Sequence, residues 1–170
     1  MKQVYIIDYI RTPIAKFQGG LSEVRADDLA AIVLKEIVKR NPQIPAEEIE
    51  DVILGCANQA GEDNRNVARM ASLLAELPIK IGGETVNRLC ASGMAAIANA
   101  YRAIAIGEGE IYLAGGVEQM TRAPYVLSKS AQPFGIDVQL FDSSFGWRFI
   151  NPKMKELYGV DGMGETAENL

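Results

Sequence analysis

The sequence of 170 residues contains no histidine and only two cysteines, Cys56 and Cys90. Histidine is the usual group that activates a serine or cysteine nucleophile, so this chain alone cannot assemble a Ser-His or Cys-His pair. The two cysteines are far apart and do not have the CxxC spacing. Two distant cysteines without a CxxC motif argue against a metal site and against a disulfide framework. They favour a cytoplasmic protein.

Long apolar runs and a surplus of basic residues are missing as well. No run approaches the ~20 apolar residues of a membrane helix, and the apolar run at the N-terminus is too short for a signal peptide. The 17 basic and 22 acidic residues give a net charge of −5. This balance argues against nucleic acid or an anionic membrane as the main partner. A hydrophobic content of 48% and a charged content of 23% are typical of a globular domain.

Strand and helix patterns alternate over residues 1–118, and this region is predicted to form one α/β core. The alternation predicts a layered βαβαβαβ fold with a mixed, mostly parallel sheet, in which the third strand is the one that could run the other way. The predicted strands are residues 4–10, 51–57, 85–89 and 110–117, and the predicted helices are residues 26–40, 64–76 and 91–106. The last helix is apolar nearly all round, so we expect it to be buried between layers.

Residues 119–170 have a different character, with closely spaced prolines and glycines and most of the phenylalanines. We expect this region to be the beginning of a loop-rich subdomain, with a short helix at residues 152–158. The final residues, 164–170, resemble a helix that has just begun, which suggests that the sequence is truncated.

Cys90 lies where a predicted strand meets the apolar helix. A thiol at a helix start feels the positive end of the helix dipole and unpaired backbone N–H groups, which stabilise the nucleophilic thiolate. A small, inert, buried residue is the alternative, and it is the commoner role of a free cysteine. For Cys56, inside a strand, burial is the favoured interpretation.

Other candidates carry weaker patterns. Gly115-Gly116 follows a strand but has no complete phosphate-binding motif. Ser92 has no histidine to activate it. Glu118 follows the fourth strand, at the sheet edge where ligands commonly bind in such folds.

The segment Asn87-Arg88-Leu89-Cys90-Ala91-Ser92-Gly93 resembles the acyl-enzyme motif of the thiolase family. Five further segments are similar to the same family, in order and over the whole chain: residues 11–14, 24–30, 55–69, 114–124 and 163–169. The resemblance implies a thiolase N-terminal portion that transfers acyl groups between a 3-oxoacyl-CoA and CoA. Cys90 would carry the acyl group, and its backbone N–H would be an oxyanion donor. Coenzyme A would be a substrate, and no permanently bound cofactor is implied.

Within the family, residues 146–154 are similar to degradative thiolases, which act on 3-oxoadipyl-CoA or fatty acyl-CoAs. Gly162 stands where biosynthetic acetoacetyl-CoA thiolases typically carry histidine, which argues against a short acetoacetyl substrate. Met163 matches a family position that lines the acyl pocket, where a flexible apolar side chain suits varied substrates. The resemblance therefore implies a role in fatty acid or aromatic catabolism.

The family is about twice as long as this chain, and its catalytic histidine, a water-orienting asparagine, its second catalytic cysteine and most of its CoA-binding residues lie in the later half. We therefore expect the isolated chain to be inactive and to require a missing C-terminal half. The family also places a further strand of the first sheet beyond this region, so we expect an open sheet edge, exposed apolar surface and homo-oligomer formation. The alternatives are a noncatalytic remnant or partner-binding half, a thiol sensor using Cys90, or a ketosynthase-like relative.

Overall fold

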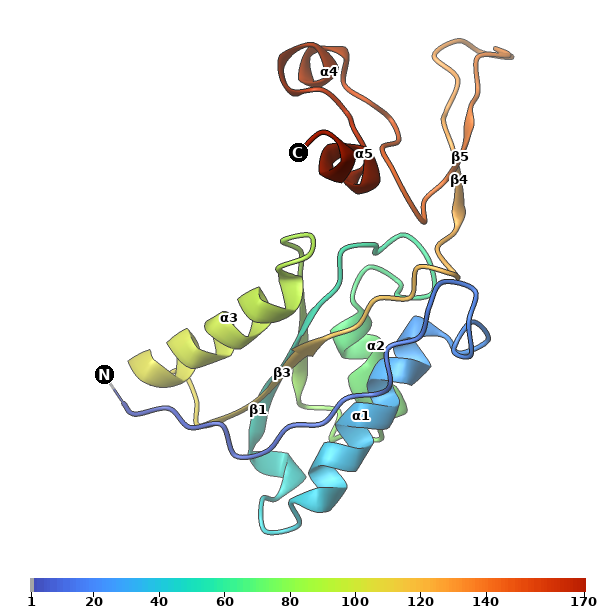
Figure 1. The fold of residues 1–170 in the computed structure, drawn as a ribbon. Helices are drawn as coiled ribbons and strands as arrows, with labels where there is room; N and C mark the ends of the chain where they lie inside the picture. The colour runs from blue at the N-terminus through green and yellow to red at the C-terminus, as the bar shows by residue number, and fades with distance from the viewer. Residues whose placement is uncertain (1) are drawn as a thin grey trace. The chain divides into compact units, whose positions relative to one another are not determined.

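The computed structural model describes residues 2–170, which divide into two compact units, one up to Arg122 and one from Ala123 to Leu170. The first unit contains a parallel sheet with helices on both faces (Figure 1). The second contains a small hairpin and two short helices. The predicted α/β fold with a mostly parallel sheet is confirmed.

Three parallel strands form the sheet of the first unit, in the order β2-β1-β3. They are β1 (Ile49–Gly55), β2 (Gly82–Val86) and β3 (Ile111–Gly116). Gly55 pairs with Val86 on one side and with Gly116 on the other, so all three strands end at the same edge. The third predicted strand thus runs parallel to its neighbour. A site at this edge would therefore be formed by the segments that follow the three strands.

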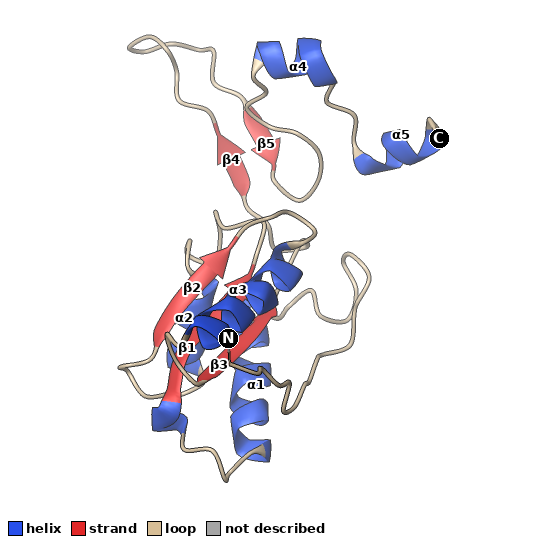
Figure 2. Cartoon of the chain, turned by 90° about the vertical axis from the view of Figure 1, so that its left-hand side faces the viewer, coloured by secondary structure: helices blue, strands red, loops and turns tan. Residues whose placement is uncertain are grey.

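Helices α1 (Ala26–Arg40) and α2 (Val67–Leu74) cover one face of the sheet, and α3 (Ser92–Ile106) covers the other (Figure 2). Alternating side chains of β1 explain this arrangement, because successive residues point to opposite faces. Val52 and Leu54 are buried in the cluster under α1 and α2, whereas Ile53 packs against Ala96 and Ala100 of α3. A short 3-10 turn, η1 (Ala46–Glu48), leads into β1.

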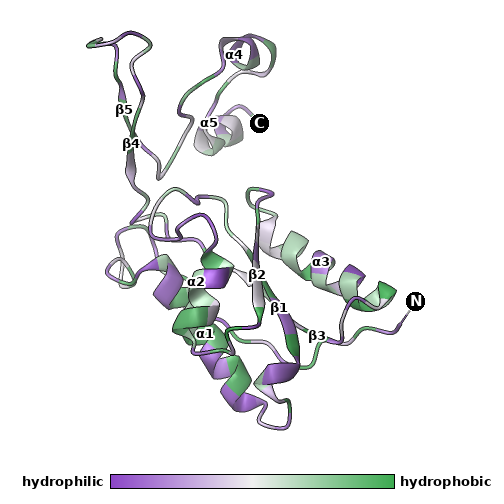
Figure 3. Ribbon diagram, turned by 180° about the vertical axis from the view of Figure 1, so that it is seen from behind, coloured by the Kyte–Doolittle hydropathy of each residue, from purple (hydrophilic) through white to green (hydrophobic). Residues whose placement is uncertain are grey.

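Helix α3 is covered on one side only, so the prediction that it is buried between layers is wrong for this chain. Its alanines face the sheet, while Met94 and Tyr101 are 76% and 53% exposed. The helix is apolar along most of its length (Figure 3), but the described residues supply a single layer against which it can pack. By length and composition alone, Leu89–Ile106 could cross a membrane, contrary to our expectation. A core helix of a soluble protein passes the same test.

The predicted strand at residues 4–10 does not form. Within residues 2–170, the backbone of residues 2–10 makes one hydrogen bond to another segment, from the Lys2 N–H to the Ala105 carbonyl at 3.1 Å. Tyr5 and Ile6 are 74% and 82% exposed. β-branched and aromatic residues favour extended backbone, but a strand also needs a neighbouring strand with which to pair. The described residues place no such neighbour beside this segment.

The second unit contains the antiparallel pair β4 (Tyr125–Leu127) and β5 (Leu140–Asp142), followed by α4 (Pro152–Tyr158) and α5 (Met163–Glu168). The predicted helix at residues 152–158 is confirmed, with Asn151 as its N-cap. The hairpin was not predicted, because strands of three residues are too short to produce an alternating pattern. An edge-to-face contact between Phe141 and Phe149, with ring centres 5.1 Å apart, joins the hairpin to the segment before α4.

Candidate active site

Cys90 lies in the turn between β2 and α3, at the edge where all three parallel strands end. Its thiol is free and exposed, whereas the Cys56 thiol is free and buried. The predicted junction of strand and helix is confirmed. Of the two cysteines, Cys90 is therefore the one that a substrate can reach.

The turn that carries Cys90 is held by the buried hydroxyl of Ser92. This hydroxyl donates to the Leu89 carbonyl at 2.6 Å and accepts from the Arg88 N–H at 2.9 Å. Leu89 has a φ of 51°, in the left-handed region that branched residues rarely adopt. Such a conformation costs about 1 kcal/mol or more and persists only where the surroundings enforce it. Ser92, which the sequence excluded as a nucleophile, thus constrains the turn that carries Cys90.

The backbone N–H of Cys90 makes no hydrogen bond within residues 2–170. It precedes α3, a helix of 15 residues, by two positions. Unpaired amides and the aligned peptide dipoles at such a helix start favour negative charge. The arrangement suits an oxyanion donor, and that role of the Cys90 amide stays a prediction.

Two glycines, Gly55 and Gly116, let the strand ends lie directly against the first turn of α3. A Cβ on Gly55 would lie 2.2 Å from the Ser92 carbonyl carbon and 2.3 Å from the Gly93 nitrogen. A Cβ on Gly116 would lie 2.9 Å from the Gly55 oxygen. Within the Gly115-Gly116 pair, considered as a weak phosphate-loop pattern, Gly116 therefore serves close backbone packing, whereas a Cβ on Gly115 would make only an ordinary contact with Leu54. No local pattern indicated that Gly55 lies against the helix after Cys90, because the two segments are distant in the chain.

Cys56 has the surroundings of a structural thiol. Its Sγ donates to the Asn58 carbonyl oxygen at 3.2 Å, and the carboxylates of Asp63 and Glu118 lie 3.9 Å from it. Burial, followed by these two negative charges, raises the pKa of the Cys56 thiol to about 12. A thiol in this state is a poor nucleophile. The favoured interpretation of Cys56 as a buried residue is confirmed.

An ion-pair cluster anchors the loop that follows Cys56. Arg122 donates two hydrogen bonds to the Glu62 carboxylate, at 2.7 and 2.6 Å, and the Arg25 guanidinium lies 3.5 Å from the same carboxylate. The hydrogen bond from Arg122 lowers the pKa of Glu62. A paired, two-point contact of this kind fixes orientation as well as distance. It ties the loop to the chain that leaves β3.

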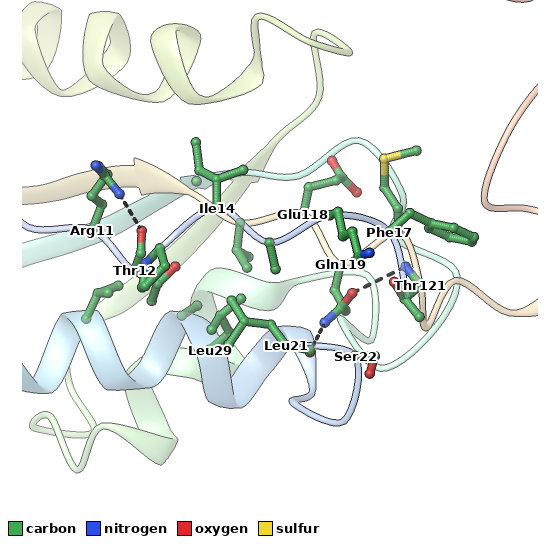
Figure 4. Close-up of a pocket in the computed structure, with 18 of the residues that line it drawn as sticks. Arg11, Thr12, Ile14, Phe17, Leu21, Ser22, Leu29, Glu118, Gln119 and Thr121 are labelled. Carbon is green, nitrogen blue, oxygen red and sulfur yellow. Dashed lines mark hydrogen bonds between the residues drawn. The ribbon is translucent and has the colours of Figure 1, made fainter. Parts of the chain in front are cut away.

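A cavity of about 370 Å³ lies beside this edge and is lined mainly by residues 10–17 and 116–121 and by part of α1. Gln119 donates to the carbonyls of Leu21 and Val24, and its side-chain oxygen accepts from the Thr121 N–H (Figure 4). Cys90 does not line this cavity. Neither cysteine lines it, so the exposed Cys90 thiol and this cavity are separate features.

Met163 is the first residue of α5 in the second unit, and its side chain is 79% exposed. Its role in lining an acyl pocket stays a prediction. No group of three or more His, Cys, Asp or Glu side chains that could hold a metal ion occurs within the described part of the chain.

The contrast between the two thiols predicts selective alkylation. In the native chain at pH 8, we expect iodoacetamide to modify Cys90 at least about 100-fold faster than Cys56, because a pKa of about 12 leaves about one Cys56 thiol in ten thousand ionised. Peptide mass spectrometry over time measures both rates. In denaturant the two rates should converge, and equal rates in the native chain would contradict the assignment of distinct roles.

Comparison with known proteins agrees with this geometry. Residues 4–170 match the family model described as the thiolase N-terminal domain. A β-ketoadipyl-CoA thiolase of Pseudomonas knackmussii is 60% identical over 169 residues, which are 99% of this chain and 42% of that protein. A 3-oxoadipyl-CoA/3-oxo-5,6-dehydrosuberyl-CoA thiolase of Escherichia coli is 58% identical over 170 residues, which are 100% of this chain and 42% of that protein.

Solved structures show the same likeness. An acetyl-CoA acetyltransferase of Bacillus anthracis is 36% identical with a TM-score of 0.77, covering 94% of this chain and 39% of that one. A thiolase of Ascaris suum in complex with coenzyme A is 39% identical with a TM-score of 0.70, covering 78% of this chain and 34% of that one. The chain spans about two fifths of the length of the curated relatives it matches. The match to the family model over residues 4–170, which agrees with the parallel α/β core and the exposed Cys90 at its strand–helix junction, establishes that the chain belongs to the thiolase family and corresponds to its N-terminal domain.

Proposed function

We propose that the protein takes part in acyl transfer between a 3-oxoacyl-CoA and CoA, with Cys90 as the acyl carrier. The observation that carries the proposal is the exposed thiol in a constrained turn, beside an unengaged amide, at the β2–α3 junction of a thiolase N-terminal domain. Storing the acyl group on sulfur divides one difficult step into two easier ones.

In the proposed reaction, the Cys90 thiolate attacks the C3 carbonyl carbon of the substrate. The bond between C2 and C3 then breaks, the electron pair leaves with the acetyl-CoA portion, and a proton from an acid completes acetyl-CoA. The thiol of a second CoA loses its proton, attacks the acyl–sulfur carbonyl and restores the Cys90 thiolate. In this proposal the Cys90 amide stabilises the oxyanion that forms at the carbonyl oxygen in both steps.

For the substrate we propose a 3-oxoacyl-CoA of the 3-oxoadipyl type, used in degradation. The support comes from the relatives that are 58–60% identical over almost the whole chain, whose names specify β-ketoadipyl-CoA or 3-oxoadipyl-CoA. The glycine at position 162, in place of the histidine expected in acetoacetyl-CoA thiolases, favours the same choice.

We further propose that the chain needs additional polypeptide for turnover. It contains no histidine that could deprotonate the Cys90 thiol. Exposed apolar side chains at residues 4–10 and on α3, including Ile6 and Met94, are suited to bind that additional polypeptide or a second copy of the chain. A homo-oligomer and a cytoplasmic location stay predictions.

A hybrid enzyme tests the function. It joins this chain to the part of the Escherichia coli relative that lies beyond the matched region. We expect the hybrid enzyme to cleave 3-oxoadipyl-CoA in the presence of CoA and the isolated chain to show no turnover, both measured by loss of the 3-oxoacyl-CoA absorbance. Thiolysis by the isolated chain would contradict the need for additional polypeptide. A folded hybrid enzyme without thiolysis would contradict the proposed activity.

A further inference from the structure

Glu118 contacts the chain just after β1, at the same sheet edge as Cys90. It follows β3 by two residues, and its carboxylate accepts hydrogen bonds from two successive backbone N–H groups, those of Ala57 at 2.8 Å and Asn58 at 3.1 Å. Its neighbour Gln119 turns its amide to the other side, toward Leu21 (Figure 4). The Glu118 carboxylate therefore holds the start of the loop that follows Cys56, and a charged acceptor makes these bonds stronger than neutral ones.

The peptide group between Ala57 and Asn58 donates its N–H to Glu118, and its carbonyl accepts a hydrogen bond from Asn87. Asn87 donates from Nδ2 to the Ala57 carbonyl at 3.0 Å, while its Oδ1 accepts from the Leu89 N–H at 2.9 Å. Asn87 thus joins the loop after β1 to the turn that carries Cys90. A continuous series of hydrogen bonds runs from the Glu118 carboxylate through Ala57 and Asn87 to Leu89.

Leu89 is the residue whose backbone most needs this support. Its left-handed φ of 51° persists only where contacts enforce it, and it directly precedes Cys90. Ser92 holds the turn from the helix side, and Asn87 holds it from the loop side. Loss of the loop-side contact would let the peptide between Leu89 and Cys90 rotate, which would redirect the Cys90 amide.

We propose that Glu118 is a positioning residue for Cys90, acting through the Ala57 peptide and Asn87 on the Leu89–Cys90 turn. This inference rests on the proposed role of Cys90 as acyl carrier. The alternative is a purely local role, in which Glu118 satisfies two amides and affects nothing beyond the loop.

Amide hydrogen exchange in the chain itself, followed by NMR, separates the two roles. In Glu118→Ala, we expect the Ala57 and Asn58 amides to exchange faster and the Leu89 amide, which Glu118 does not touch, to exchange about fivefold faster, as loss of one hydrogen bond permits. Glu118→Gln keeps one acceptor oxygen and should fall between the wild type and Glu118→Ala. The matched control is Glu156→Ala, which removes an exposed carboxylate that makes no hydrogen bond within residues 2–170 and should leave all these amides unchanged.

The hybrid enzyme supplies the functional measurement. Glu118→Ala should lower kcat about tenfold to hundredfold, the scale of a small misplacement of a reacting group, with the KM for CoA changed by less than about twofold. Because both side chains act through the Ala57 peptide, Glu118→Ala combined with Asn87→Ala should be no slower than Asn87→Ala alone.

The inference would be overturned if the Leu89 amide exchanged at the wild-type rate in Glu118→Ala. It would also be overturned if the double variant lost kcat by the product of the two single losses. The exchange experiment does not depend on turnover. An unchanged Leu89 exchange rate would therefore contradict the role of Glu118 and leave the proposed function intact. Activity that survives loss of the Cys90 thiol would contradict the proposed function and leave the exchange result unchanged.

Discussion

Replacing Cys90 with serine is expected to lower the kcat of the hybrid enzyme by about three orders of magnitude or more, the scale of loss when a covalent nucleophile is removed. The substitution keeps the size of the side chain and its place in the turn, but a hydroxyl ionises far less readily than a thiol. Single-turnover assays with 3-oxoadipyl-CoA, with mass spectrometry for the acyl-enzyme, measure both the rate and the adduct.

The matched control for Cys90→Ser is Cys56→Ser. The Cys56 thiol is buried and donates to the Asn58 carbonyl, a bond that a serine hydroxyl can also make. The control should keep kcat within about twofold and still form the acyl-enzyme at Cys90, as expected for a substitution outside the reacting groups. An acyl adduct on Cys56, or full activity in Cys90→Ser, would show that the nucleophile has been assigned wrongly.

Replacing Gly55 with alanine is expected to destabilise the chain by about 3 kcal/mol, the upper end of the usual cost of overpacking. The added methyl group would stand 2.2 Å from the Ser92 carbonyl carbon and 2.3 Å from the Gly93 nitrogen. Both are backbone atoms of the first turn of α3, so relief requires that the helix move away from the sheet. Urea unfolding followed by circular dichroism measures the loss of stability as a lower midpoint.

Gly20→Ala supplies the control, since a Cβ there meets nothing within 4 Å. Its midpoint should stay near that of the wild type or rise slightly, because alanine restricts the unfolded chain more than glycine does. If Gly55→Ala unfolds at the same urea concentration as Gly20→Ala, the close approach of β1 to α3 described above is wrong. Faster alkylation of Cys56 in Gly55→Ala would support a displaced α3.

Elements with strong local patterns were predicted well. The helix predicted at residues 26–40 forms as α1 over the same residues, with acidic residues in its first turn and basic residues in its last. The helix predicted at residues 64–76 is shorter, as α2 begins after the N-cap Asn66, whose side chain accepts from the Arg69 N–H. Helix periodicity and end residues are local properties, so sequence alone is sufficient to locate these helices within a few residues.

The prediction at residues 4–10 failed for a non-local reason. The segment has the composition of a strand, yet most of its apolar side chains are exposed and it joins no sheet within residues 2–170. The apolar outer face of α3 shows the same effect, since its composition predicts burial that the described residues do not supply. In both cases the local preference was identified correctly, while the partner that would satisfy it lies outside the segment itself.

For the site, local sequence was enough to identify Cys90 as a thiol between a strand and a helix, and the family motif pointed to the same residue. Local sequence could not show that Cys56 is inactivated, because its raised pKa comes from burial and from Glu118, which lies 62 positions away. Nor could it show the close contact of Gly55 with α3, or the hydrogen bonds through which Asn87 reaches a carbonyl 30 positions away. These features arise where parallel strands bring distant segments to one edge, so they depend on the folded arrangement and not on neighbouring residues.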